Sequence, residues 1–544
     1  MKRLTSLFLL LCSSLAFSQT FQWVREGSGI GQDVGQGVTV DKAGNVYVTG
    51  NFSGEATFSG TLFTGNGIFD IFIAKYNPSG NLLWLRSAGG LQNDEGHGIT
   101  TDNDGNIYVT GYFSETAQFH DDMGHSVQLV SSGNTDIFIA KYDSSGNLLW
   151  ARKAGGTQDD EGTRIILDAQ NHVFLTGFFS DRGIFSGKSV ISKGNNDAFI
   201  ARYDTSGNCQ WVQSLGGSGM DKSFGLAADS TGNSYITGFF YYSVSFSNNA
   251  TVLQADGLSS DIFTVKYDID GTILWAQRIG GPYNDAAFGI AVDKEESFYI
   301  TGYFLETATF GDFTLDAIGY NDIFVAKYDS TLDCIWAINE GGEHLDLGLD
   351  IGLDNSGNVY VGGTYDSIGI FGNDTLVTLQ YYDMFVSKYN DKGIMQWVRH
   401  AGGDKGDFAM SICVQDFDLV YATGYYKQFA TFGDHETFYG KESDIFITKI
   451  AYSVGIDDAP FPSPALLVYP NPSDGVFTLQ LPPDIRGEAQ LTITDIHGKT
   501  VYRQHILHPQ KTAFIRMDAP PVGIYIISVK NEKAALTGRI AVTR

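Results

Sequence analysis

The sequence is poor in the residues that cross-link or interrupt a fold. It has four cysteines in 544 residues; one is Cys12, and the other three, Cys209, Cys334 and Cys413, are widely spaced. An odd number of distant cysteines excludes a disulfide framework, so packing must stabilise the fold. Only two of the 12 prolines precede residue 460. Because proline is excluded from central strands, its scarcity before residue 460 leaves room for many strands there.

Long apolar runs are also scarce. The chain begins MKRLTSLFLLLCSSLAFSQT, in which Lys2 and Arg3 precede a short apolar stretch and small polar residues follow. This order is typical of a secretory signal peptide, which we place at residues 1–19. No later segment is apolar over the length that a membrane helix needs. We therefore predict an exported chain with no transmembrane segment.

Basic residues are outnumbered. The chain has 35 lysines and arginines against 62 aspartates and glutamates, a formal net charge of −27. From residue 457 onward 8 acidic residues face 9 basic ones, so the excess of acid lies in the earlier part. A strongly negative surface repels phosphate backbones and attracts cations. We therefore predict no nucleic-acid partner.

Internal repetition is the most prominent feature that the sequence does have. The string DIFIAKYNPSGNLLW at residues 70–84 returns as DIFIAKYDSSGNLLW at residues 136–150, and weaker copies follow. Three markers each recur seven times at intervals of 61 to 66 residues. They are the aspartate that begins this string (Asp70, Asp136, Asp197, Asp261, Asp322, Asp383, Asp444), the glycine of TGxF (Gly50, Gly111, Gly177, Gly238, Gly302, Gly363, Gly424) and the tryptophans (Trp23, Trp84, Trp150, Trp211, Trp275, Trp336, Trp397). The sequence therefore contains seven units.

Each unit holds four strand-like pieces, for example GHGITTD, NIYVTGYF, DIFIAKYD and NLLWARK within residues 96–153. Such a unit cannot bury both faces of its sheet alone, whereas seven units in a closed ring can. The seventh unit ends at residues 444–450 without a tryptophan strand, and the strand FQWVREG at residues 21–27 stands alone after the signal peptide. We predict that this N-terminal strand completes the last blade and closes the ring.

These units resemble the seven-bladed β-propeller repeat (SBBP-type) family of secreted bacterial proteins. The resemblance covers residues 21–450 and implies an all-β fold with a seven-bladed β-propeller at residues 20–450. Two units depart from the pattern: Glu295-Glu296-Ser297 replaces the D-x-x-G-N turn in one, and Gly362-Gly363-Thr364 alters TGxF in another.

Proline marks a change of composition near residue 460. The stretch APFPSPA is typical of an extended linker, which we place at residues 451–465. Beyond it, apolar runs alternate with turn signals, which predicts a small Ig-like β-sandwich at residues 466–544.

This C-terminal part resembles the sorting domain of the type IX secretion system of Bacteroidota. The matching residues are Tyr469, Pro470, Asn471, Pro472 and Gly475, then Asp495, Gly498 and Lys499, then Gly523, Ile524 and Tyr525. The resemblance implies the type IX machinery as a partner, and release from the cell or display on its surface. An ordinary Ig-like accessory module is the alternative.

A second aspartate recurs where each unit enters its innermost strand: Asp33, Asp94, Asp160, Asp221, Asp285, Asp346 and Asp407. We predict that these residues encircle one mouth of the central channel. A ring of carboxylates would attract cations. Capping of backbone amides is the alternative role.

We expect catalytic side chains at positions where the seven units differ in sequence. The loops QNDEGHG (92–98) and TQDDEGTR (157–164) lie on the same rim of adjacent units and add Glu95, His97, Asp159, Glu161 and Arg164 to the recurring aspartates. Paired carboxylates with a histidine and an arginine suit acid–base chemistry on a glycosidic or ester bond, with Glu95, His97, Asp160 and Glu161 as the candidate catalytic residues. Solvated loop charges are the alternative explanation.

Metal-ligand residues gather in one longer segment between the second and third strands of a unit. It carries His120, Asp121, Asp122 and His125, which are candidate metal ligands. Turns such as DNDG at residues 102–105 suit Ca²⁺ in part, but they lack the later bidentate glutamate of an EF-hand loop. No cofactor is evident, and Ca²⁺ is the one candidate.

No HExxH, GxSxG or phosphate-binding loop is present. The leading interpretation is therefore a secreted or cell-surface propeller scaffold, expected to be a monomer, which binds a glycan, a protein or another ligand through its loop rims. A secreted carbohydrate- or peptide-acting enzyme that uses the acidic rim of the first blades is one alternative. A purely structural extracellular component is the other.

Overall fold

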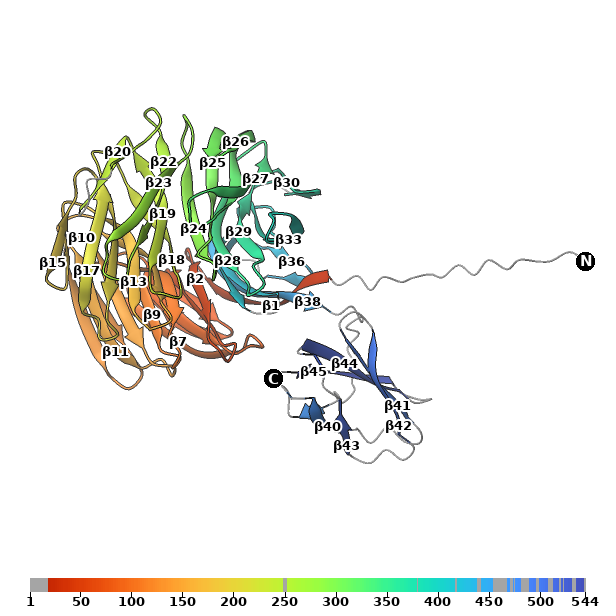
Figure 1. Cartoon of the computed structure of the whole chain (residues 1–544). Helices are drawn as coiled ribbons and strands as arrows, with labels where there is room; N and C mark the ends of the chain where they lie inside the picture. The colour runs from red at the N-terminus through yellow and green to blue at the C-terminus, as the bar shows by residue number, and fades with distance from the viewer. Residues whose placement is uncertain are drawn as a thin grey trace, which may run out of the picture. The chain divides into compact units, whose positions relative to one another are not determined.

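The computed structural model divides the chain into two compact units, Met1–Gly455 and Ile456–Arg544 (Figure 1). In the first unit it describes residues 18–247, 252–378, 380–415, 418–437 and 442–453. In the second it describes residues 467–469, 473, 475–480, 489–495, 499–506, 512–517, 520–521, 523–530 and 535–542. Almost all of the predicted signal peptide and most of the predicted linker lie outside these ranges.

The first unit consists of seven antiparallel four-stranded blades, in each of which consecutive strands lead outward from the centre. Blades I to III contain β2 (Val34–Val40), β3 (Val46–Phe52), β6 (Asp70–Tyr76) and β7 (Leu82–Gly89); β8 (Glu95–Thr101), β9 (Ile107–His120), β10 (Ser126–Tyr142) and β11 (Leu148–Gly155); and β12 (Glu161–Leu167), β13 (Val173–Phe179), β16 (Asp197–Tyr203) and β17 (Cys209–Gly216). Blades IV and V contain β18 (Lys222–Ala228), β19 (Ser234–Tyr241), β22 (Ser260–Tyr267) and β23 (Ile273–Ile279); and β24 (Ala286–Val292), β25 (Phe298–Phe310), β26 (Phe313–Tyr328) and β27 (Cys334–Gly342). Blades VI and VII contain β28 (Leu347–Leu353), β29 (Val359–Tyr365), β32 (Asp383–Tyr389) and β33 (Met395–Ala401); and β34 (Phe408–Gln415), β35 (Leu419–Lys427), β38 (Ser443–Ser453) and β1 (Ser18–Gly29).

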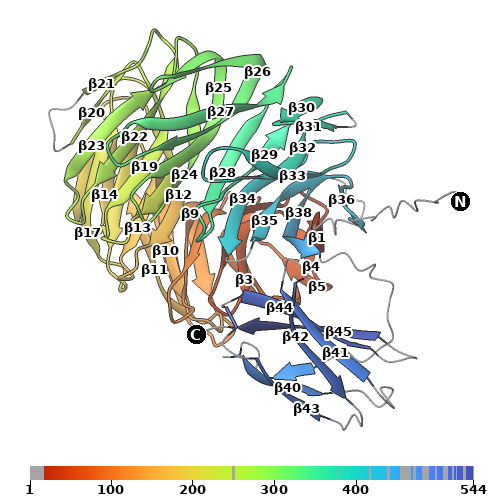
Figure 2. The same ribbon diagram turned by 45° about the vertical axis from the view of Figure 1, so that its right-hand side comes forward.

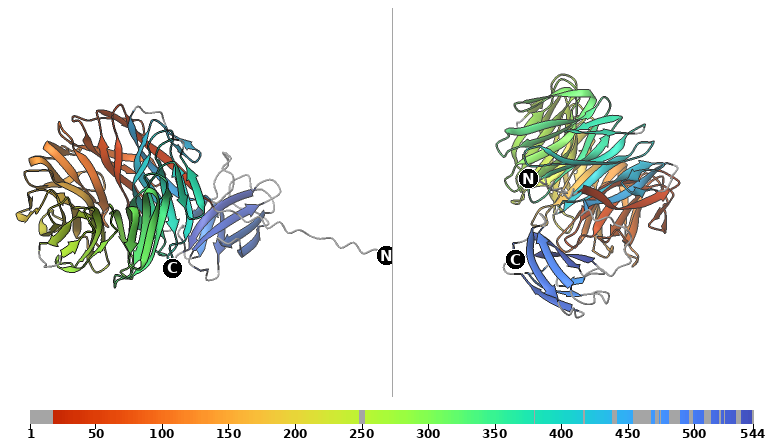
Figure 3. Two further views of the ribbon diagram at one scale, coloured as in Figure 1. Left: turned by 90° about the horizontal axis from the view of Figure 1, so that it is seen from above. Right: turned by 90° about the vertical axis from the view of Figure 1, so that its right-hand side faces the viewer.

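The innermost strands form a closed ring. They contact one another in the order β2, β8, β12, β18, β24, β28 and β34, and β34 in turn contacts β2. The colours of Figure 3 accordingly follow one another around a central axis. The predicted seven-bladed propeller is therefore confirmed.

The N-terminal strand closes this ring as the outer strand of blade VII. β1 runs antiparallel to β38, with Gln19 opposite Tyr452 and Gly27 opposite Ile445. The side chain of Trp23 is packed into the blade, at 7% exposure, and its indole N–H donates to the backbone oxygen of Pro78. Figure 2 shows β1 beside β38 although they are far apart in the sequence. The predicted closure is confirmed.

A hairpin also ties each blade to the blade before it. The segment between the second and third strands of a blade folds back and pairs with the outer strand of the preceding blade. The hairpins are β4 (Glu55–Phe58) with β5 (Thr61–Thr64), the outer arms of β9 and β10, β14 (Arg182–Phe185) with β15 (Lys188–Ile191), β20 (Ser243–Phe246) with β21 (Val252–Gln254), the outer arms of β25 and β26, β30 (Ile368–Phe371) with β31 (Asp374–Val377), and β36 (Thr431–Phe432) with β37 (His435–Glu436). The sequence did not predict this pairing, because the hairpins differ in length and composition.

The recurring glycine of TGxF marks a close backbone contact. A side chain on Gly177 would lie 2.0 Å from the backbone oxygen of Glu161 in the neighbouring inner strand. The same contact is 1.8 to 2.0 Å in all seven blades. Carbon cannot approach oxygen so closely, so the inner two strands of each blade can pair only when this position has no side chain.

We therefore expect the substitution Gly177→Ala to lower the free energy of unfolding by about 3 kcal/mol, because the overpacked atoms belong to the backbone and cannot move aside. Gly406→Ala is the matched control, since the nearest atoms to its new methyl group are ring carbons 3.5 and 3.6 Å away. Urea unfolding of both variants measures the difference. Equal stability of the two variants would contradict the steric explanation.

The second unit has two small antiparallel sheets. One contains β39 (Leu467–Tyr469), β40 (Val476–Gln480) and β43 (Thr512–Arg516); the other contains β42 (Thr500–Ile506), β41 (Ala489–Asp495), β44 (Gly523–Lys530) and β45 (Ala535–Val542). Phe477 and Ile515 from the first sheet pack in one core with Leu491, Ile493 and Ile527 from the second. This packing is the predicted β-sandwich. Pro470, Asn471, Pro472 and Gly498 of the predicted sorting motifs lie outside the described residues.

Candidate binding pocket in the central channel

Each innermost strand contains a β-bulge at the same position. In β8, for example, the pairing with β9 shifts register between Gly96 and Gly98, so that His97 has no partner in the ladder. A bulge turns the side chain of the extra residue away from the regular pleat. The seven bulge residues are Gln36, His97, Thr163, Phe224, Phe288, Leu349 and Met410.

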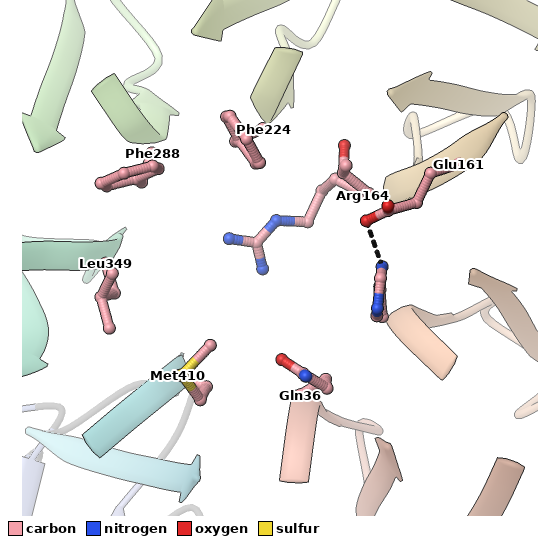
Figure 4. Close-up of a pocket in the computed structure, with 9 residues that line it drawn as sticks. Gln36, Glu161, Arg164, Phe224, Phe288, Leu349 and Met410 are labelled. Atoms are coloured by element: carbon pink, nitrogen blue, oxygen red, sulfur yellow. Dashed lines mark ion pairs between the residues drawn. The ribbon is translucent and has the colours of Figure 1, made fainter. Parts of the chain in front are cut away.

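All seven bulge residues line one pocket in the channel, together with Glu161 and Arg164 (Figure 4). Its volume is about 310 Å³. The bulge residues of blades I to III are polar, whereas those of blades IV to VII are apolar. The rings of Phe224 and Phe288 meet edge to face, with their centres 5.3 Å apart. The pocket therefore has one polar wall and one apolar wall.

Two carboxylates hold the imidazole of His97 on the polar wall. Its Nδ1 lies 3.0 Å from Glu161 Oε1, and its Nε2 lies 3.5 Å from Glu95 Oε2. The hydroxyl of Tyr112 donates to the other oxygen of Glu95 at 2.6 Å. Burial would lower the pKa of His97, but the charges and hydrogen bonds of Glu161 and Glu95 outweigh it and raise this pKa to about 10. His97 is therefore an imidazolium at neutral pH.

An ion pair crosses the channel from blade III to blade VI. Arg164 donates from Nη2 to Asp350 Oδ1 at 2.7 Å and from Nη1 to Asp350 Oδ2 at 3.3 Å. Asp350 also accepts the hydroxyl of Ser411 and the backbone N–H of Ile412, both at 2.9 Å. In blades I, II, IV and V the equivalent position is a glycine: Gly37, Gly98, Gly225 and Gly289. Only two blades thus supply the charges that span the channel at this level.

We expect Arg164→Gly to destabilise the propeller by about 3 kcal/mol, because it leaves the largely buried Asp350 carboxylate without its cation. The double variant Arg164→Gly/Asp350→Gly restores the residue type of four other blades and should lose clearly less stability. Chemical denaturation of the wild type and both variants tests this. A double variant less stable than the single one would show that the ion pair does not account for the loss.

The structure brings together three of the four predicted acid–base residues, namely Glu95, His97 and Glu161. Asp160 lies apart from them, because it is fully buried. Its carboxylate accepts the backbone N–H of Gly156 and that of Ser180. It therefore has no open face toward the pocket.

The other six aspartates of the predicted channel-mouth ring share the environment of Asp160. All seven are fully buried, and each accepts the backbone N–H of the residue twenty positions later. Six of them also accept the N–H of the glycine four positions earlier. These side chains are therefore buried caps between blades and do not form a ring open to the channel.

The predicted metal ligands separate into two interactions. Asp121 Oδ2 contacts His125 Nδ1 at 2.8 Å and also accepts the backbone N–H of Leu148, while Asp122 pairs with Arg86 at 2.9 Å. Among the residues that the structure describes, no three histidines, cysteines or carboxylates cluster as a metal site. His120, Asp121, Asp122 and His125 therefore do not converge on one point.

Sequence reasoning missed Gln36, the apolar wall and Asp350. A signal for them exists in the repeats: the third residue after each recurring aspartate differs in chemistry from blade to blade, whereas the residue before it is glycine, alanine or serine in every blade. Its meaning depends on the bulge, which the repeat pattern does not reveal.

Comparison with known proteins agrees with the two-unit organisation. Residues 467–543 match the family model of the secretion system C-terminal sorting domain, and residues 22–51 and 83–112 match the β-propeller repeat model. Within the described residues no helix is long and apolar enough to cross a membrane.

The curated relatives are distant and much longer. The chain is 24% identical over 458 residues to an uncharacterised WD repeat-containing protein of Acanthamoeba polyphaga mimivirus, covering 68% of this chain and 33% of that protein. It is 28% identical over 171 residues to regulatory protein FlaEY of Caulobacter vibrioides, covering 31% and 18%. The chain thus spans about a third or less of these relatives.

Solved structures are similar at low sequence identity. A puromycin hydrolase shares 11% identity, with coverage of 85% of this chain and 61% of that chain and a TM-score of 0.38. Virginiamycin B lyase from Staphylococcus aureus shares 13%, with coverage of 62% and 95% and a TM-score of 0.26.

Proposed function

Since the chain is a β-propeller repeat protein with a type IX sorting domain, exported to the cell surface or secreted, we propose that it is an extracellular binding protein that holds a small ligand in its channel pocket. The sorting domain serves export, and the propeller serves recognition. Binding takes place without turnover.

The bulge residues carry this proposal. Seven blades share one backbone arrangement, so a position that served architecture alone would need the same kind of side chain in each. The seven bulge positions instead hold polar side chains on one arc and apolar side chains on the other. A concave site with an apolar surface and a few convergent polar groups is the usual form of a small-molecule site.

The charges of the polar wall favour binding over catalysis. A general base must be free to accept a proton, and His97 is held protonated between Glu95 and Glu161. A secreted carbohydrate- or peptide-acting enzyme is the second candidate, for which the two glutamates beside one pocket are the supporting observation. A purely structural component would need no pocket chemistry.

The test is a screen of the full mature chain against small metabolites and glycans by ligand-observed NMR. We expect saturable binding that Phe288→Ala abolishes and that Phe313→Ala, a control on the 37% exposed Phe313 of β26, leaves unchanged. Hydrolysis of a panel substrate that Glu161→Gln removes would replace the proposal with the enzyme. Absence of any Phe288-dependent binding would favour the structural component.

A further inference from the structure

We propose, on the basis of this function, that the ligand is an α-amino acid unit with an apolar side chain. The recognised chemistry is an α-ammonium group, the carboxyl or carbonyl oxygen beside it, and an apolar side chain. A free amino acid or the N-terminal residue of a peptide supplies all three.

Glu161 provides the site for the ammonium group. One of its oxygens contacts His97 at 3.0 Å, and its side chain retains 25% exposure. Glu161 also lines the pocket (Figure 4). An ammonium group placed there would donate a charge-assisted hydrogen bond to this carboxylate.

Arg164 provides the site for the carboxyl or carbonyl oxygen. A guanidinium group has five N–H donors, and Asp350 occupies only two of them. Figure 4 shows this group extending into the middle of the ring of bulge residues. Gln36 also lines the pocket, and its amide forms no hydrogen bond within the described part of the chain. Donors for one oxygen acceptor are therefore available next to the ammonium site.

The apolar wall provides the site for the side chain. Phe224, Phe288, Leu349 and Met410 face the polar wall across the cavity. A volume of about 310 Å³ is at the small end for ligand sites and suits one amino-acid unit. A sugar would need hydrogen-bond partners around its whole ring, and these four residues offer none.

The charges of the wall match a ligand that carries both signs. Each cation on it is paired with a carboxylate: His97 with Glu161, and Arg164 with Asp350. A zwitterion, or an ammonium beside a carbonyl dipole, leaves this balance intact. A ligand with only one charge would leave an unmatched charge in a confined site.

Calorimetry on the full mature chain tests the assignment. We expect L-phenylalanine and L-leucine to bind, while glycine, 2-phenylethylamine and 3-phenylpropionate, each lacking one of the three features, bind at least about tenfold more weakly, or ~1.4 kcal/mol. The dipeptide Phe-Gly should bind and Gly-Phe should not if the source is a peptide N-terminus; binding of phenylalanine alone identifies the free amino acid.

Glu161→Gln should weaken phenylalanine binding about tenfold and leave 3-phenylpropionate unaffected, because only the ammonium contact is lost. Glu295→Gln, at an exposed glutamate outside the pocket, is the matched control. Equal affinity for phenylalanine and 2-phenylethylamine would overturn the assignment. The assignment would also be overturned if no amino acid bound at a concentration of about 10 mM, because even weak complexes have dissociation constants of ~1 mM. In either case, Phe288-dependent binding of another compound would leave the proposed function standing.

Discussion

A mature chain that begins at Gly31, and so lacks β1, should not form a stable propeller. It loses the outer strand of blade VII with the buried side chains of Phe21 and Trp23. A backbone hydrogen bond contributes about 1 kcal/mol net, and burial of a large apolar side chain about 1.5–3 kcal/mol. The ladder of β1 with β38 and β4 therefore contributes on the order of 10 kcal/mol, similar to the whole stability of a typical domain.

Circular dichroism and size-exclusion chromatography measure this loss. A chain that ends at Gly455 is one control, because the first unit is compact by itself, and it should fold normally. A circular permutant is the sharper control: Ser453 lies opposite Ser18, so a short turn can join them while the chain begins at Gly31. We expect this permutant to recover most of the native stability. A stable truncated chain, or a permutant as unstable as the truncation, would contradict closure by β1.

The propeller should be most stable in weak acid and lose stability as the pH rises toward 8. Burial is the largest cause that raises the pKa of the seven capping aspartates, to about 8 for Asp33, Asp285 and Asp407 and to about 7 for Asp94, Asp160, Asp221 and Asp346. The charge of a second aspartate, at the start of the third strand of the preceding blade, raises each pKa further. Folding therefore takes up protons at these positions.

The sign follows from linkage. In the unfolded chain these carboxyls ionise near their usual pKa of 3.8, so their contribution to stability is complete below about pH 4 and is lost as the pH rises through 7 to 8. A tenfold difference between the acid dissociation constants of one carboxyl group in the folded and the unfolded chain corresponds to about 1.4 kcal/mol of unfolding free energy. The seven groups together therefore change this free energy by several kcal/mol. Asp121, whose pKa hydrogen bonds lower to about 2 although burial opposes them, contributes in the opposite sense and loses its contribution only below about pH 4.

Calorimetry at constant ionic strength should show a Tm roughly 10 °C higher at pH 5 than at pH 8.5. Thermal unfolding near pH 6, followed in buffers of different ionisation enthalpy, should release several protons per molecule. A Tm that stays constant or rises between pH 5 and pH 8.5 would mean that the buried aspartates are ionised in the folded state.

The closing strand could be predicted from sequence because its signals are local. The strand that contains Trp23 precedes the first complete unit, and the last unit lacks a tryptophan strand. Counting the strands of each unit was therefore enough to assign the first strand to the last unit. The candidate site could be predicted only in part. Glu95, His97 and Glu161 belong to adjacent units, so the repeat alignment placed them near one another. The same alignment placed Asp160 with them, although its carboxylate accepts backbone N–H groups from its own loop and from the loop after β13.

By itself, the sequence determined the number of blades, the closure by the first strand and the export of the chain, because periodic spacing and short terminal motifs require no knowledge of distant contacts. The tertiary structure alone decided the pocket, the interblade hairpins and the pairing of Arg164 with Asp350. The physical reason is that these contacts form only when the seven blades close into a ring. Residues such as Gln36 and Phe288, on opposite sides of the channel, face a common space only when the seventh blade meets the first, and a bulge in each inner strand turns their side chains toward it.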